Sequence, residues 1–243
     1  MSLSVERQQQ LELLIHDFGL VLAPSSLDLS PLHEALCHSS AGLEIDHEQM
    51  EFLGDAVLRL AAAEYLQEHK ASLSVGARSA LRAQLVSDRW LTELAQQLEL
   101  DQFIAMGPAA AKDPTASATI GAECCEALVG GIYLAWGGAA GGLQAVRRWL
   151  DPHWSRTCAE LSADPHRHNW KSALQEWSQG NKGVLPDYRT EEKTSSHGSP
   201  ERFLSKVSIG GTLLGEGLGP SRRLAEQAAA QAALKQLRPH SKS

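Results

Sequence analysis

The sequence predicts two domains, an all-α domain followed by a small domain with the order helix, three strands, helix. Apolar residues recur at helical spacing over roughly the first 155 residues, and strand-like alternation begins only after a polar, proline-containing stretch at 161–168. We therefore expect an all-α domain at 1–155, a linker at 156–168 and a second domain at 169–239. The helical spacing is clearest at 11–15, 91–95 and 143–150, and Pro24, Gly107–Pro108 and Pro152 are interpreted as breaks between helices.

Composition and charge favour two modules of opposite charge. The chain has 243 residues, of which 43% are hydrophobic, so it can bury a substantial core. Residues 164–243 contain 12 Lys and Arg against 8 Asp and Glu, a net charge of +4, whereas residues 1–163 contain 10 against 21, a net charge of −11. This asymmetry suggests an acidic metal-binding module tethered to a basic module that binds a phosphate backbone.

The sequence disfavours membrane and secreted classes of protein. It has no run of about 18 uninterrupted apolar residues, and its start lacks the apolar region of a signal peptide. The four cysteines show no CxxC spacing, which argues against a zinc site, so we expect reduced and mostly buried thiols. A soluble cytoplasmic protein is the resulting expectation.

Three carboxylates lie on one stripe of a predicted helix in the first domain. Glu48, Glu51 and Asp55 are three and four residues apart, so they return to the same helical face. The stripe becomes apolar within one further turn, as expected at the rim of a buried site. Gly54 costs about 1 kcal/mol relative to Ala in a helix interior, a cost that the close approach of another backbone explains.

A second acidic pair lies on another predicted helix. Glu123 and Glu126 are three residues apart, and Gly130 follows on their stripe one turn later. If the two helices cross at their glycines, four carboxylates converge, which is unfavourable unless a hard divalent cation neutralises them. Mg²⁺ suits such a site because it prefers oxygen ligands and retains bound waters, and Mn²⁺ is a possible substitute.

Several motifs, in order along the chain, resemble the ribonuclease III endonucleases. Residues 48–56 resemble the signature of that family, residues 35–39 resemble the element that precedes it, and residues 81–87 and 126–134 continue the match. The resemblance implies an all-α endonuclease domain that hydrolyses double-stranded RNA with Mg²⁺ and leaves 5′-phosphates. It also implies a homodimer that makes one cut in each strand, with the two cuts staggered.

The resemblance assigns roles to individual residues. It implies that the metal is bound by Glu51, Asp55, Glu123 and Glu126. Asp55, Glu126 and Glu48 would also be catalytic, with Glu48 helping to shape the cleft rather than binding the metal. Phe52 is a core residue by default, but the resemblance places it in the homodimer interface.

Two positions depart from the family pattern and leave the function open between two hypotheses. Glu123 stands where the family usually has Asp, and Val75 stands where it usually has another Glu. The chain is therefore either an active endoribonuclease or a catalytically degenerate double-stranded RNA-binding protein that keeps the nuclease fold as a dimerisation scaffold. Ribosomal precursors, messenger duplexes and antisense duplexes all present the same A-form surface, so the natural substrate stays open. His38 is interpreted as a structural histidine without a chemical role.

The second domain has the pattern of a helix, three short strands and a second helix. Ser221 is a natural N-cap, so Arg222 and Arg223 lie at a helix N-terminus, where free N–H groups and the helix dipole favour a phosphate. The first helix is expected to include 170–177, the strands 187–190, 203–209 and 213–217, and the last helix begins after Ser221.

This domain resembles a double-stranded RNA-binding domain over roughly seventy residues. By that resemblance, Gln175 and Glu176 on the first helix would contact 2′-hydroxyl groups in a minor groove. The loop between the first two strands, with His197 and Ser199, would reach the next minor groove. The phosphates between the two grooves would be held by Ser221, Arg222 and Arg223.

Overall fold

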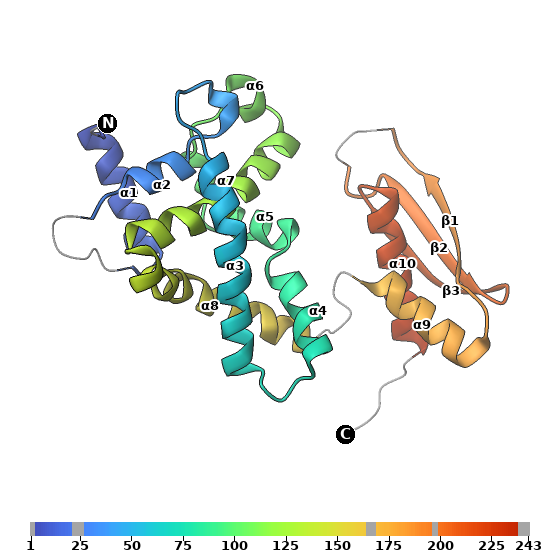
Figure 1. Ribbon diagram of the computed structural model, residues 1–243. Helices are drawn as coiled ribbons and strands as arrows, with labels where there is room; N and C mark the ends of the chain where they lie inside the picture. The colour runs from blue at the N-terminus through green and yellow to red at the C-terminus, as the bar shows by residue number, and fades with distance from the viewer. Residues whose placement is uncertain (1–2, 21–26, 164–168, 196–198, 238–243) are drawn as a thin grey trace. The chain divides into compact units, whose positions relative to one another are not determined.

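The computed structural model describes residues 3–20, 27–163, 169–195 and 199–237. The chain divides into two compact units, Met1–Thr157 and Cys158–Ser243, which are described separately below (Figure 1). The first unit is built from helices and the second from two helices and a sheet, so the predicted fold class is confirmed. The elements of the first unit are α1 (Val5–Asp17), α2 (Ser30–Ala35), η1 (Ser39–Ala41), α3 (Glu48–His69), α4 (Val75–Leu85), α5 (Asp88–Gln97), η2 (Leu100–Gln102), α6 (Pro108–Ala111), α7 (Pro114–Ala135), η3 (Gly138–Ala140) and α8 (Gly142–Ala163), whose last residues, from Cys158, fall in the second unit.

Short polar side chains begin several helices of the first unit. Ser4, Ser74 and Ser87 each accept a hydrogen bond from the backbone N–H three residues later, at the starts of α1, α4 and α5. Asp113 caps α7 in a similar way. These caps satisfy N–H groups that have no partner within the helix, and they fix where each helix begins.

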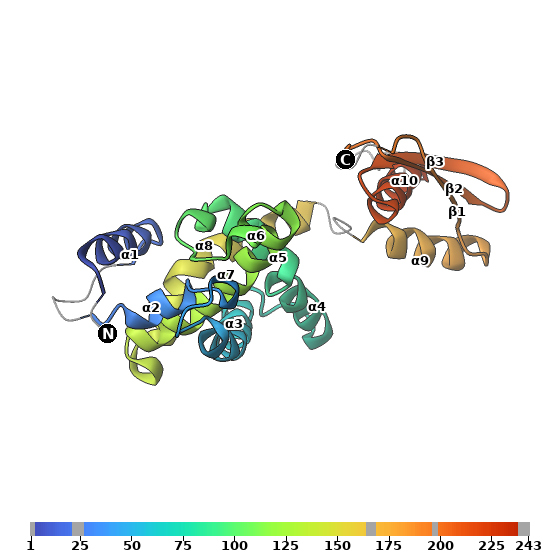
Figure 2. The ribbon, with the colours of Figure 1, turned by 90° about the horizontal axis from the view of Figure 1, so that it is seen from above.

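Helix α7 is central to the first unit. It packs against α2, α3 and α5, and it lies beside α3 in both Figure 1 and Figure 2. By length and apolar composition, α7 is the one helix among the described residues that could cross a membrane. More than half of its apolar window is buried inside the unit, which is the pattern of a core helix.

Helix α8 corrects the expectation that Pro152 breaks the chain between helices. The helix runs from Gly142 to Ala163, and Pro152 lies inside it. Trp149 and Trp154, on either side of the proline, are both buried. Their packing holds the helix together although proline removes one backbone hydrogen bond. The expected break at Pro24 lies outside the described residues.

The same helix extends into the stretch expected to be a linker. Residues 156–163 of the predicted linker 156–168 are helical because α8 ends only at Ala163, and residues 164–168 lie outside the described residues. The domain limits 1–155 and 169–239 stay predictions. All four cysteines are buried thiols, as expected.

The second unit is a three-stranded antiparallel sheet with two helices on one face (Figure 1). The sheet has the order β1-β2-β3, and a register shift between Val207 and Ser208 bends the β2–β3 pair. The strand β2 has the predicted bounds, whereas β1 and β3 each extend beyond the predicted residues. The elements are α9 (Trp170–Lys182), β1 (Asp187–Glu192), β2 (Phe203–Ile209), β3 (Thr212–Gly219) and α10 (Arg222–Leu237).

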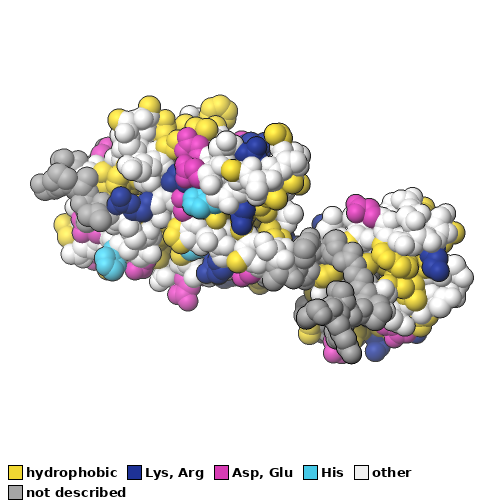
Figure 3. Space-filling model, turned by 90° about the horizontal axis from the view of Figure 1, so that it is seen from below, with side chains coloured by type: hydrophobic (Ala, Val, Ile, Leu, Met, Phe, Trp, Pro, Cys, Tyr) yellow, Lys and Arg dark blue, Asp and Glu magenta, His cyan; other side chains and the backbone are white. Residues whose placement is uncertain are grey.

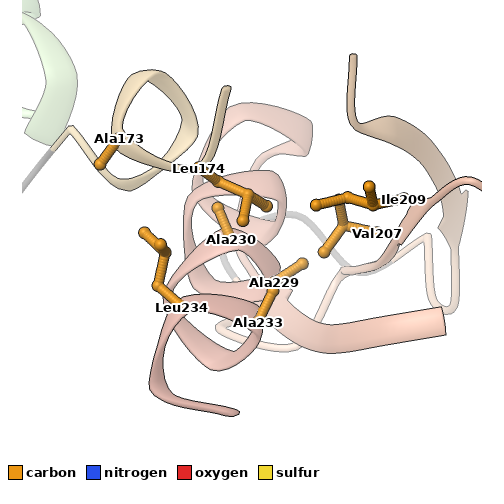
Figure 4. Close-up of a cluster of buried hydrophobic side chains, with 8 residues drawn as sticks. All are labelled: Ala173, Leu174, Val207, Ile209, Ala229, Ala230, Ala233 and Leu234. Atoms are coloured by element: carbon orange, nitrogen blue, oxygen red, sulfur yellow. The ribbon is translucent and has the colours of Figure 1, made fainter. Parts of the chain in front are cut away.

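The core of the second unit forms between α9, β2 and the alanine face of α10 (Figure 4). Leu174 of α9 and Val207 of β2 meet Ala229 and Ala233 of α10 there. The strand β3 approaches α10 even more closely, because a Cβ added to Gly217 would lie within 3.0 Å of the Ala229 nitrogen. Alanine on the helix and glycine on the strand therefore allow the helix to lie directly on the sheet.

The surface of neither unit carries charge of a single sign. On the face drawn in Figure 3, acidic, basic and apolar side chains are interspersed on both units. The net charges of −11 for residues 1–163 and +4 for residues 164–243 are therefore sums over mixed surfaces.

Candidate active site

Two glycines allow α3 and α7 to cross with their backbones in contact. A Cβ added to Gly54 would lie within 3.0 Å of the Glu126 carbonyl group, and one added to Gly130 would lie within 3.0 Å of the Met50 carbonyl oxygen. Any other residue at either position would have to push the helices apart. The crossing expected from the sequence is confirmed, and it places the acidic stripes of the two helices against each other.

Asp55 of α3 and Glu126 of α7 meet at this crossing. The two carboxyl groups are close enough for each to shift the pKa of the other. Burial, and then the negative charge of Asp55, raise the pKa of Glu126 to about 7.

Asp55 also has a cationic partner that the sequence analysis did not identify. The Nε of Arg59, one turn later on α3, donates a hydrogen bond to Oδ1 of Asp55 at 2.7 Å. This bond holds the pKa of Asp55 below its usual value. The four-residue spacing on one helix was a readable signal for the pair.

Glu51 and Glu123 are contacted by two histidines. His47 precedes α3, and its Nε2 lies 3.3 Å from Oε2 of Glu51 and 3.9 Å from Oε2 of Glu123. His38 lies in the loop before η1, and its Nε2 is 3.2 Å from Oε2 of Glu123. Burial raises the pKa of Glu51, and the nearby imidazole of His47 opposes that rise.

One candidate metal-binding group is formed by Glu123 and the two imidazoles, next to the other carboxylates of the crossing. The side chains of His38, His47 and Glu123 offer three ligand atoms that all lie within 4.8 Å of one another. The carboxylate oxygens suit Mg²⁺, and the imidazole nitrogens extend the fit to Mn²⁺. Burial and the charges of Asp55 and Glu51 raise the pKa of Glu126, and a bound divalent cation would relieve this crowding of acids.

Other residues predicted for this site lie at its edge or away from it. Glu48 is exposed at the first position of α3, and its charge contributes to the raised pKa of Glu51. Phe52 is 84% exposed, so the default interpretation of Phe52 as a core residue is wrong. Val75 is exposed at the start of α4. The catalytic and interface roles of these residues stay predictions.

In the second unit, the residues predicted to bind RNA lie at three places. Gln175 and Glu176 are exposed on α9, and Ser199 lies in the turn before β2, where its carbonyl accepts a hydrogen bond from the N–H of Arg202. His197 lies outside the described residues. Ser221 begins α10, and its Oγ accepts a hydrogen bond from the Leu224 N–H at 3.3 Å, which confirms it as an N-cap.

The two arginines at the start of α10 differ in their surroundings. Arg223 is exposed. Arg222 donates from a terminal nitrogen to the Thr190 carbonyl oxygen at 3.3 Å, and its guanidinium carbon lies 5.5 Å from the centre of the Phe203 ring. These contacts orient the guanidinium in advance and leave several of its N–H groups for a phosphate.

The sequence analysis missed His38, His47 and Arg59 as parts of the site. His47 precedes Glu51 by four residues, so helical spacing could have indicated their contact. His38 is separated from Glu123 by 85 residues and lies in a loop, so no periodic pattern connects the two. Its only sequence signal was its place in the motif at 35–39. We expected no chemical role for His38, and the structure places its imidazole in contact with Glu123.

Comparison with known families covers both units. The family described as Ribonuclease-III-like matches residues 29–151, and the family described as double-stranded RNA binding motif matches residues 170–237. Each match coincides with one of the two units of the fold.

Individual proteins match over most of the chain. A protein named Ribonuclease 3 from Prochlorococcus marinus is 48% identical and covers 86% of this chain and 82% of its own length. One named Ribonuclease 3 2 from Nostoc sp. is 41% identical and covers 96% and 94%, respectively. A solved nuclease domain of ribonuclease III from Campylobacter jejuni, reported for flexibility in a region involved in dimer formation, is 31% identical. It has a TM-score of 0.51 and covers 58% of this chain and 96% of its own.

Proposed function

Because the chain belongs to the ribonuclease III family of double-strand-specific endoribonucleases and carries the double-stranded RNA binding motif, we propose that it hydrolyses phosphodiester bonds of double-stranded RNA at a Mg²⁺ centre between α3 and α7. The observation that carries this proposal is the glycine crossing of α3 and α7, which gathers four carboxylates from two helices. A solvated acidic face would not need two backbones in contact, and it would not raise the pKa of Glu126 to about 7.

Each carboxylate has a distinct place in the proposed centre. Asp55 and Glu126 face each other across the helix crossing and would hold the cation between them. Glu51 and Glu123 complete the ligand set, oriented by the imidazoles of His47 and His38. When bound, Mg²⁺ or Mn²⁺ would lower the pKa of a coordinated water and stabilise negative charge on the reacting phosphate. Glu48, at the exposed edge, would shape the cleft.

The second unit would hold the RNA duplex while the first unit cuts it. Gln175 and Glu176 are exposed on α9, where their side chains can reach 2′-hydroxyl groups of a minor groove. Arg222 and Arg223 at the N-terminus of α10 would bind the phosphates. His197 and Ser199 would bind RNA from the loop between β1 and β2, which would enter the next minor groove.

We further propose that the enzyme is a homodimer. Phe52 is 84% exposed beside Glu51, and so large an apolar side chain at the edge of the acidic centre fits a surface covered by a second copy. Two centres in one dimer would cut the two RNA strands at staggered positions. The proposal includes a cytoplasmic role in RNA processing, with ribosomal precursor RNA and messenger duplexes as candidate substrates.

The proposal is tested by cleavage of a long, end-labelled RNA duplex with Mg²⁺ and with EDTA. We expect cleavage by the parent with Mg²⁺ and none with EDTA. Glu126→Gln keeps the shape of the side chain but removes one anionic ligand, so it should abolish cleavage while duplex binding, measured in EDTA by gel shift, changes little. If the correctly folded parent failed to cleave with either Mg²⁺ or Mn²⁺, the chain would be a degenerate nuclease that only binds RNA.

A further inference from the structure

We propose that His38 is a positioning residue that holds the carboxylate of Glu123 toward the metal centre. This inference rests on the proposed function, because it takes Glu123 as a metal ligand. It adds to that function a residue on a separate loop, and it offers a reason why glutamate, with one methylene more than aspartate, can serve at this position. Four observations carry it.

The first observation is a chain of hydrogen bonds that ends on Glu123. The backbone N–H of Gly107 donates to Oγ of Ser40 at 3.0 Å, and this hydroxyl lies 2.7 Å from Nδ1 of His38. On the other side of the ring, Nε2 of His38 lies 3.2 Å from Oε2 of Glu123. The carboxylate is thus connected through an imidazole and a hydroxyl to the backbone of another segment.

The second observation determines which ring nitrogen carries the proton. The backbone N–H of Ser40 points at Nδ1 of His38 at 3.1 Å, and a backbone N–H can only donate. Nδ1 is therefore an acceptor, which leaves the proton of the neutral ring on Nε2. The Nε2–H group then donates to Glu123, so in this arrangement His38 supports a ligand and is not a ligand itself.

The third observation is that the loop carrying His38 is itself fixed. The N–H of His38 donates to the Ala105 carbonyl oxygen at 2.9 Å, and the Ala105 N–H donates to the Leu36 carbonyl oxygen at 2.8 Å. Gly107 also packs so closely on the Ser40 backbone that an added Cβ would lie within 3.0 Å of its carbonyl oxygen. A donor held by backbone contacts can select one orientation of a flexible side chain.

The fourth observation is that His38 is enclosed by the site. Its side chain is mostly buried, and its ring lies 4.7 Å from the ring of His47, which is 3% exposed. With the ring packed in this way, little water competes for its Nε2–H. The longer Glu123 side chain has more rotamers than aspartate would have, and the bond from His38 removes much of that freedom before a cation binds.

The test measures binding of Mn²⁺ to the full-length protein, following the free ion by electron paramagnetic resonance. His38→Leu removes the donor, whereas His38→Gln keeps an amide N–H near the position of Nε2. We expect His38→Leu to raise the dissociation constant about 10- to 100-fold, the usual effect of losing a group that orients a ligand, and His38→Gln to stay within about 3-fold of the parent. His16→Leu, at an exposed site on α1, is the matched control and should bind as the parent does.

Two further variants separate the possible outcomes. Glu123→Ala sets the loss expected when the ligand itself is absent, and adding His38→Leu to Glu123→Ala should cause no further loss, since the two residues act through one contact. Ser40→Ala should weaken binding about 2- to 10-fold, as expected for one hydrogen bond, and it provides a milder test if His38→Leu does not fold by circular dichroism.

The inference is overturned if Glu123→Ala loses Mn²⁺ while His38→Leu and Ser40→Ala bind it like the parent. It is also overturned if His38→Gln loses as much affinity as His38→Leu, because the imidazole would then be a direct ligand. If Glu123→Ala itself binds Mn²⁺ like the parent, Glu123 is not a ligand. That result contradicts the proposed composition of the metal centre, and it is distinct from the failure of the positioning role alone.

Discussion

Replacing Gly130 with alanine tests the helix crossing on which the proposed site depends. The new methyl group would lie within 3.0 Å of the Met50 carbonyl oxygen and 3.1 Å from the Gly54 nitrogen. Backbone atoms on α3 cannot rotate away as a side chain can, so the two helices must separate. Overpacking of this kind costs about 1–3 kcal/mol, and we expect a value near the upper end.

The intrinsic preference of alanine for a helix opposes this cost. Alanine is more favourable than glycine in a helix interior by about 1 kcal/mol. The net effect of Gly130→Ala is therefore a loss of about 2 kcal/mol in the free energy of unfolding, which lowers the melting temperature by about 4–8 °C for a domain of this size. Separation of the helices should also move Glu126 away from Asp55 and weaken the binding of Mg²⁺.

Thermal unfolding followed by far-UV circular dichroism measures the effect, with Gly76→Ala as the matched control. Gly76 lies in the first turn of α4, and an added Cβ there would meet nothing within 4 Å. This control should leave the melting temperature unchanged or raise it slightly. The gain in free energy of unfolding should be less than the roughly 1 kcal/mol that alanine gains over glycine in a helix interior. If Gly130→Ala melted at or above the parent temperature, the close approach of α3 and α7 would be refuted.

Three further predictions concern charge. Because the pKa of Glu126 is raised to about 7, the folded metal-free protein binds more protons than the unfolded chain between the usual glutamate pKa and neutrality. Its free energy of unfolding should thus fall as pH rises through about 7. Urea titrations should show a flatter dependence of this free energy on pH for Glu126→Gln than for the parent, and equal dependences in both proteins would contradict the raised pKa. Replacing Arg222 and Arg223 together with alanine should weaken binding to all RNA duplexes alike. It should also flatten the dependence of log affinity on log salt concentration, since each arginine is proposed to neutralise about one phosphate. An unchanged slope would show that other residues make the phosphate contacts. Glu123→Asp should retain a cleavage rate within about 10-fold of the parent, whereas Glu123→Ala should lose far more, as measured in single-turnover assays. If Glu123→Ala cleaved like the parent, Glu123 would not be a metal ligand.

Local patterns in the sequence were sufficient for much of the fold. Phe203, Val207 and Ile209 alternate with more exposed residues, and β2 has the predicted bounds because a half-buried strand requires this alternation. Pro152 was misinterpreted for the converse reason. Its local preference for ending a helix is overridden by the burial of Trp149 and Trp154, which is a tertiary effect that no local pattern reports.

The candidate site was predictable to the extent that helical spacing defines it. Glu51 and Asp55 share a face with each other, as do Glu123 and Glu126, and the glycine on each face indicated where the two helices meet. The spacing could not reveal His38, because the contact with Glu123 depends on how a loop is tied to the segment at Ala105. Residues that orient ligands come from wherever the fold brings a donor, so they lack a periodic signal.

The groups around the carboxylates also explain how four acids can share one crossing. Asp55 is paired with Arg59, Glu51 and Glu123 face imidazoles, and the raised pKa of Glu126 favours a proton on its carboxyl group. A cation must displace the proton and compete with the guanidinium, whereas a donated N–H bond from an imidazole can persist on the second lone pair of a ligand oxygen. The affinity of the centre for a cation therefore depends on how much better the cation stabilises the four carboxylates than their existing partners do. If the proposed metal centre is correct, the residues surrounding the acids, as much as the acids themselves, would set its affinity for Mg²⁺.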